Sequence, residues 1–132
     1  MTKVFLGGTC NGSTWRDDLI PMLEIEYFNP VVDDWTPDCM EEERRQREEC
    51  AICLYVITPE MTGVYSIAEA VDDSNKRPGK TVFCYLGGNV GEEFTEGQRK
   101  SLGQVARMVF ENGGTAWTSL DEVAKHLNAQ LF

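Results

Sequence analysis

One carboxylate in the chain stands among small and aliphatic neighbours, directly after an apolar run. It is Glu69, within the stretch TPEMTGVYSIAEAVDDSNKRPGK (58–80). A carboxylate of this kind can serve as a nucleophile that forms a covalent intermediate. The same glutamate also completes the tetrapeptide SIAE (66–69), which matches the S-x-x-E capping box of a helix start. Both roles, helix cap and nucleophile, remain open from the motif alone.

Helical spacing around this glutamate indicates which way it points. The apolar residues Val64, Ile67, Ala68 and Val71 recur at the spacing of a helix and predict the stripe that packs on the core. With Val64 set to zero on a helical wheel, the other three lie within about 60° of it and Glu69 lies at about 140°. We therefore expect Glu69 to point off the core, toward the loop side.

Short apolar runs alternate with helical patterns five times along the chain. The predicted strands are KVFL (3–6), EYFNP (26–30), AICLYVI (51–57), KTVFCYL (80–86) and TAW (115–117). Helices are predicted after an N-cap at Ser13 or Thr14, over 38–49, from Val64 onward, within 96–114 with a C-cap at Gly113 and Gly114, and after Thr118 or Ser119. This alternation predicts an α/β sandwich with a five-stranded parallel sheet in the order 2-1-3-4-5, covered by helices on both faces.

In such a sheet, ligands bind beyond the carboxyl ends of the strands, at the switch point between the first and third strands. The segments expected at this edge are GGTCNGST (7–14), TPEMTGVYS (58–66) and GGNVGEE (87–93). Two of them begin with a glycine pair, which lets backbone approach a ligand closely, and the third leads into Glu69. Glu69 is therefore expected near the ligand-binding edge.

Three segments carry a family resemblance: VFLGG (4–8), YFNPVVDDW (27–35) and VITPEMTGVYSIAEAVDDSNKRPGKTVFCYL (56–86). Together they resemble the nucleoside 2-deoxyribosyltransferase family, in particular its small bacterial and phage-type members, over roughly residues 3–89. The resemblance implies a flavodoxin-like fold and cleavage of the N-glycosidic bond of deoxynucleosides, with Glu69 as the nucleophile that attacks C1′. A carboxylate suits an anomeric carbon with oxocarbenium character, because it splits one displacement into two easier steps. No cofactor and no metal are expected.

The resemblance also implies substrate contacts on the helix before the third strand and after that strand. Glu43 corresponds to the acidic residue that addresses the base, and Glu42 is almost as well spaced. Many members hold the sugar with an Asp or Ser at the position that is Gly63 here. Thr62, Tyr65 or Ser66 could substitute for it.

Further substrate contacts are implied in the other loops. Gly7 and Gly8 match the glycine turn after the first strand, with Thr9 as a donor, and Asp33 and Trp35 lie after the second strand. Trp35 could stack on a base. Asn89 corresponds to the loop that reaches a neighbouring subunit's site, so we expect a homo-oligomer, at least a dimer. Purely structural roles remain open as well. The glutamates could be solvated charges on a helix, the glycines could form a tight turn, and the tryptophan could cover the hydrophobic core.

Size and charge bound the remaining possibilities. The chain has 132 residues, which suits one domain over 1–132. Its 12 basic and 22 acidic residues give a net charge of −10, which repels phosphate backbones and argues against nucleic-acid or anionic-membrane partners. No window reaches 18 apolar residues, and the N-terminal residues do not resemble a signal peptide. We expect a cytoplasmic protein with a small-molecule partner.

Five cysteines and a single histidine, His126, argue against a metal centre. Cys50 and Cys53 form a C-x-x-C, but they open a predicted strand, so free thiols are expected.

Two other functions stay open: a non-catalytic nucleotide-binding protein of the same fold, favoured by Gly63, and an FMN carrier, because TCNGST (9–14) faintly resembles a flavodoxin phosphate loop. The base, the sugar and any need for a 5′-phosphate stay open too. The three edge loops contain no Lys or Arg except near their ends, as Arg16 and Arg77. This shortage of basic residues slightly favours nucleosides over phosphorylated substrates.

Overall fold

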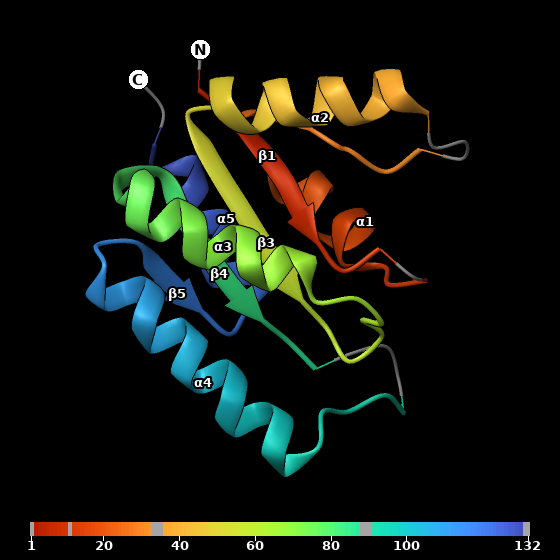
Figure 1. The fold of residues 1–132 in the computed structure, drawn as a ribbon, viewed down its shortest axis with the longest axis vertical. Coiled ribbons are helices and arrows are strands. Elements are labelled where there is room, and N and C mark those ends of the chain that lie inside the picture. The colour runs from red at the N-terminus through yellow and green to blue at the C-terminus, as the bar shows by residue number, and fades with distance from the viewer. Residues whose placement is uncertain (1, 11, 33–35, 88–90, 131–132) are drawn as a thin grey trace.

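The computed structural model describes residues 2–10, 12–32, 36–87 and 91–130. A five-stranded, all-parallel sheet in the order β2-β1-β3-β4-β5 forms its centre (Figure 1). The strands are β1 (Lys3–Gly8), β2 (Glu26–Phe28), β3 (Ile52–Ile57), β4 (Thr81–Tyr85) and β5 (Thr115–Trp117). The predicted α/β architecture and strand order are confirmed, and the arrangement is that of flavodoxin-like proteins.

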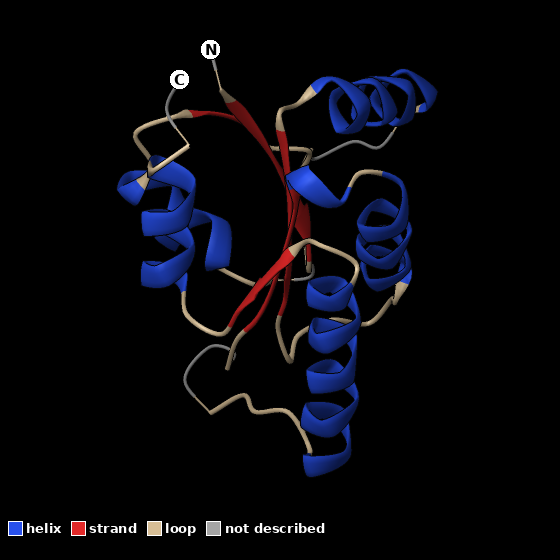
Figure 2. Ribbon diagram, turned by 90° about the vertical axis from the view of Figure 1, so that its left-hand side faces the viewer, coloured by secondary structure: helices blue, strands red, loops and turns tan. Residues whose placement is uncertain are grey.

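Helices cover both faces of the sheet, as the edge-on view in Figure 2 shows. The helices are α1 (Trp15–Leu19), α2 (Pro37–Glu49), α3 (Tyr65–Lys76), α4 (Glu96–Glu111) and α5 (Leu120–Asn128), with 3-10 turns at Ile20–Met22 and Pro78–Lys80. None of the helices in the described ranges has the length and apolar character needed to cross a bilayer.

Two apolar clusters fill the space between the sheet and its helices. On the face covered by α1 and α5, Leu19, Val123 and Leu127 pack against the side chains of β1, β3 and β4. On the other face, the cluster includes Tyr55 and Ala70, together with residues of α4. Every residue of β3 is buried, as expected for a central parallel strand covered on both sides.

Local sequence signals set the end of α4 and the start of α5 where the sequence predicts them. Gly113 has a φ of +107°, and its N–H donates to the carbonyl of Phe110 while that of Gly114 donates to the carbonyl of Val109. This is the Schellman pattern, and it confirms the predicted glycine C-cap of α4. Ser119 is the N-cap of α5, with its side chain accepting from the N–H of Glu122.

The start of α3 differs from the prediction. Val64 is the N-cap of this helix and no side-chain cap hydrogen bond is present there, so Ser66 already lies inside the first turn. Glu69 is therefore two residues further into the helix than a capping box requires. The capping-box interpretation of SIAE is wrong.

The inner face of α3 also differs from the predicted apolar stripe. Val64 is 66% exposed and Ala68 is exposed, whereas Ala70, Asp73 and Ser74 are buried. The helix is rotated so that a carboxylate, Asp73, lies inside, because that carboxylate finds ion-pair and hydrogen-bond partners on other elements. Apolar periodicity could not anticipate a buried charge.

Candidate functional site

A hollow of about 300 Å³ lies where β1 and β3 end, at the predicted switch point. We call it the strand-end hollow. Its lining includes all four substrate-binding candidates predicted after β3, and the full set is Gly8, Thr9, Cys10, Ile57, Met61, Thr62, Gly63, Tyr65 and Ser66. Tyr65 stands at its rim, 73% exposed. A Cβ added to Gly63 would meet no atom within 4 Å, so the site has open space at this position.

A second hollow of about 300 Å³, which we call the glutamate hollow, adjoins the first through Gly8 and Cys10. It is lined by Gly7, Gly8, Cys10, Arg16, Pro30, Val31, Val32, Glu43 and Glu69. A third hollow of about 290 Å³, lined by Met40, Glu43, Arg44, Arg47, Tyr65 and Glu69, shares both glutamates with it. The tertiary structure thus brings Glu69, Glu43 and the glycine turn to one place. The two predicted carboxylates line the same space.

The glycine turn is required by packing within the sheet. Gly8 has a φ of +122°, and a Cβ there would collide with the backbone carbonyl of Val56 in β3. The N–H of Thr9 donates to that same carbonyl, and the Thr9 hydroxyl accepts from the N–H of Thr58 at 3.0 Å. Gly7 and Gly8 therefore let β1 and β3 end side by side, while part of the hydrogen-bonding capacity of Thr9 is used inside the protein.

Arg16 is a buried cation beneath this turn. Its guanidinium donates to the carbonyls of Leu6 and Thr9, at 3.0 and 2.7 Å, and lies within 3.4 Å of the carbonyl of Gly8. Burial lowers the pKa of the Arg16 guanidinium. Because it lines the glutamate hollow, Arg16 belongs to the site, although the sequence placed it only near the end of an edge loop.

Glu69 comes from the second turn of α3, and its side chain is only 11% exposed. Burial raises the pKa of its carboxyl to about 7; the nearby Arg47 guanidinium opposes that rise, and the charges of Glu43 and Asp73 add to it. In the described part of the chain, Arg47 is its ion-pair partner, with Nη1 3.7 Å from Oε2. A carboxylate that titrates near neutrality in a hollow is a functional-site candidate.

The choice between Glu42 and Glu43 is decided by the face of α2 on which each lies. The side chain of Glu42 is 43% exposed and accepts from Nε of Arg45 at 3.0 Å and from Gln46 at 2.9 Å. The hydrogen bond from Arg45 lowers the pKa of Glu42. Glu43 instead lines the glutamate hollow and the third hollow together with Glu69, and burial raises the pKa of Glu43. The structure therefore brings Glu43, and not Glu42, to the site.

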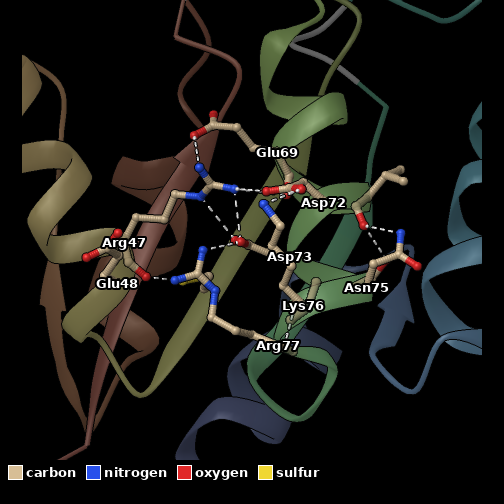
Figure 3. A network of polar contacts seen from close by, with 12 residues as sticks. Arg47, Glu48, Glu69, Asp72, Asp73, Asn75, Lys76 and Arg77 are labelled. Atoms are coloured by element: carbon tan, nitrogen blue, oxygen red, sulfur yellow. Dashed lines mark hydrogen bonds and ion pairs between the residues drawn. The ribbon is translucent and has the colours of Figure 1, made fainter.

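Arg47 is a residue that the sequence analysis missed. From α2 its guanidinium reaches three carboxylates of α3: Glu69, Asp72 at 3.2 Å and Asp73 at 2.9 Å (Figure 3). Its spacing of four residues after Glu43 is that of an ion pair within one helix, and this spacing does not reveal a contact with α3. The acidic pair in VDD (71–73) could have pointed to Arg47, because two adjacent carboxylates on α3 predict a cationic neighbour once α2 and α3 are known to be adjacent.

Some predicted residues fall outside the described ranges. Asp33, Trp35 and Asn89 belong to this group, and so their predicted substrate contacts stay predictions. The five cysteines are free thiols. Among the described residues, no three His, Cys, Asp or Glu side chains are grouped so as to hold a metal ion.

The chain matches a known protein family. A family model described as nucleoside 2-deoxyribosyltransferase like covers residues 1–93, which include β1 to β4, Glu43, Arg47 and Glu69. No curated protein and no solved structure matches the chain.

Proposed function

Since the chain belongs to the nucleoside 2-deoxyribosyltransferase-like family, we propose that it breaks or exchanges the N-glycosidic bond of a (deoxy)nucleoside or nucleotide, through a covalent glycosyl-enzyme on Glu69. The observation that carries this proposal is a largely buried carboxylate, Glu69, that lines the same hollows as a second carboxylate, Glu43. Paired carboxylates are the groups that glycoside-bond chemistry uses.

The reaction has two steps. In the first, a carboxylate oxygen of Glu69 bonds to C1′ while the C1′–N bond breaks, and the electron pair leaves with the base. Glu43, whose pKa is raised, supplies the proton that the departing base takes up. In the second, water or another base attacks C1′ and gives up a proton to the carboxylate of Glu43, while the bond from C1′ to Glu69 breaks and the carboxylate of Glu69 leaves with its electron pair. Water gives hydrolysis, and a second base gives transfer.

The strand-end hollow and the glutamate hollow are each large enough for part of a nucleoside, since ligand sites begin at about 300 Å³. In the proposal the sugar lies over Gly8, between the two hollows, because Glu69 must face C1′. Thr62, Tyr65 and Ser66 then contact the sugar from the strand-end hollow, opposite Glu69. The open space at Gly63 admits a larger or differently substituted sugar.

The direct test is incubation with a panel of deoxynucleosides, ribonucleosides and their 5′-phosphates, each with a different free base. Released or exchanged base is expected with at least one substrate. A slow 2-fluoro substrate should leave a glycosyl adduct on Glu69, detected by peptide mass spectrometry. The adduct should persist in Glu41→Gln, an exposed glutamate on α2 outside the hollows, and vanish in Glu69→Gln. An adduct on any other residue would refute the assignment.

A second candidate function is nucleotide binding without turnover, favoured by Gly63, which offers no side chain to hold the sugar. Calorimetry with the same panel separates the two functions. Tight binding with no base released from any compound, in a protein with Glu69 intact, would favour the binding protein.

Assembly is part of the proposal, because the resemblance assigns Asn89 to the site of a neighbouring subunit. Light scattering at tens of micromolar should give at least twice the 14.9 kDa of one chain. A monomer under these conditions would remove the role assigned to Asn89.

A further inference from the structure

Arg47 is held in place by more groups than a surface ion pair would need. Its Nε donates to the hydroxyl of Tyr55 at 3.0 Å and to Asp73 at 3.2 Å, while Nη2 pairs with Asp73 at 2.9 Å and with Asp72 at 3.2 Å. Nη1 is left to face Oε2 of Glu69 (Figure 3). A guanidinium presents its donors in a rigid fork, so fixing two nitrogens also fixes the third.

Asp73 anchors this arrangement from inside the protein. Its carboxylate is fully buried and accepts hydrogen bonds from Arg47, from the Tyr55 hydroxyl and from Arg77, the last at 2.6 Å. The end of α2 is tied down as well, because Nζ of Lys80 donates to the carbonyls of Glu48 and Cys50, both at 2.8 Å. Arg47 therefore has little freedom to leave Glu69.

The pair of Arg47 and Glu69 is poorly screened by solvent. Their side chains are 16% and 11% exposed, so their attraction is stronger than that of a surface pair at the same separation. The carboxylate of Asp73, four residues along the same helix, accepts hydrogen bonds from three side chains, whereas the carboxylate of Glu69 accepts none from the described part of the chain. The carboxylate of Glu69 is thus balanced by one charge and otherwise open to the hollow.

We propose that Arg47, clamped by Tyr55, Asp72 and Asp73, is a positioning residue that keeps the carboxylate of Glu69 ionised and directed into the hollow for attack on C1′. This inference rests on the proposed function of Glu69. The charge of Arg47 opposes the burial that would otherwise keep Glu69 protonated and non-nucleophilic. When Glu69 becomes a neutral ester, Arg47 still has Asp72 and Asp73, so no buried cation is left unpaired.

Other charged groups around Glu69 contribute to its pKa in the wild-type protein. Besides Arg47, the titratable and charged groups in the surrounding hollows or on its own helix are Cys10, Arg16, Glu43, Arg44, Tyr65, Asp72, Asp73 and Lys76. Burial, Glu43 and Asp73 favour the protonated form, and Arg47 favours the ionised form. Removing Arg47 must therefore raise the pKa of Glu69 above its value of about 7.

The test measures the charge of Glu69 and the turnover separately. Glu69 is titrated directly by the carboxyl ¹³C signal that disappears in Glu69→Gln, in the wild type, Arg47→Lys and Arg47→Gln. In Arg47→Gln we expect the pKa of Glu69 to rise by at least about one pH unit, which means a roughly fivefold loss of kcat/KM relative to the wild type at pH 7 and recovery of most of that loss at pH 9. Arg47→Lys should lie between, since one ammonium replaces the charge but not the fork.

Two further variants guard this test. Arg45→Gln is the matched control, because Arg45 lies on the same helix and pairs with Glu42 and Glu49 at the surface; its profile should equal that of the wild type. Tyr55→Phe covers the case in which Arg47→Gln does not fold. It keeps the buried ring and removes only the hydroxyl that holds Arg47 Nε, so a smaller shift in the same direction is expected.

The outcomes separate the two proposals. An unshifted Glu69 titration in folded Arg47→Lys and Tyr55→Phe, with an active wild type, would overturn the inference and leave the proposed function intact. A shifted titration in a wild type that neither releases nor exchanges base would overturn the proposed function, while the control of Arg47 over the charge of Glu69 would stand. A loss of turnover that is equal at all pH values would assign Arg47 to structure alone.

Discussion

The two faces of the sheet differ in what fills their centres. The face under α1 and α5 is filled by aliphatic and aromatic side chains, including Trp15, Leu19 and Leu127, which are at most 2% exposed, and its buried cation, Arg16, lies at the strand ends against backbone carbonyls. The face under α2 and α3 buries charges next to apolar residues, with Arg47 and Asp73 at the centre. Burying apolar surface needs no particular partner, whereas a buried charge is tolerated only with a specific one. The first face therefore contributes stability, whereas in our proposal the second face gives up some stability to orient Glu69.

The largest expected effect falls on the charged face. Glu69→Gln should lower turnover by about a thousandfold or more, because an amide is a far poorer nucleophile at an anomeric carbon. Its thermal unfolding at pH 8 should not be lower than that of the wild type, since the change removes a buried charge. Steady-state kinetics and calorimetry on the same samples check both halves. Undiminished turnover would contradict the assignment of Glu69, on the charged face, as the nucleophile.

The apolar face should respond in the opposite way. Leu127→Ala should lower the free energy of unfolding by about 2–5 kcal/mol, because it leaves a cavity in a fully buried cluster. The folded fraction should keep the kcat of the wild type, since the residue is not among those that line the three hollows. Urea unfolding and assays well below the midpoint measure the two effects. A specific loss of kcat would mean that this face also positions the site.

Stability should depend on pH through the charged face. The pKa of Glu69 is raised in the folded protein to about 7, so the protonated form contributes stability below its ordinary pKa, and this contribution is lost as pH rises through about 7. The difference is on the order of 3 kcal/mol between the two limits. Unfolding of wild type and Glu69→Gln should therefore diverge from pH 5 to pH 8, with the wild type falling relative to the variant. Parallel curves would contradict this.

The smallest effect concerns two neighbouring glutamates. Glu43→Gln should change the preference among bases by about tenfold and alter the preference among sugars less, since Glu43 addresses the base in the proposed reaction. Glu42→Gln is the matched control because it differs by one position and faces solvent. Competition assays with mixed bases give the ratio of kcat/KM values. Equal effects of the two variants would mean that base preference does not depend on the face of α2 on which the glutamate lies.

Much of the fold follows from local patterns. The order of strands and helices, the Schellman end of α4 at Gly113 and the burial of β3 were all predicted, because each depends on residues close together in the chain. The carboxyl ends of β1 and β3 could be assigned to a ligand site for the same reason, since strand order follows from the alternation of elements. By itself, the sequence determined where Glu69 stands relative to the sheet edge.

What Glu69 contacts was decided only by the tertiary structure. The rotation of α3 exposes Val64 and buries Asp73, which apolar periodicity could not reveal because an ion pair, and not hydrophobicity, stabilises the inner position. The choice of Glu43 over Glu42 and the reach of Arg47 to Glu69 depend on the packing of two helices from separate parts of the chain. Charge pairs between helices are set by distances of a few ångströms, and the spacing of residues along the chain does not contain those distances.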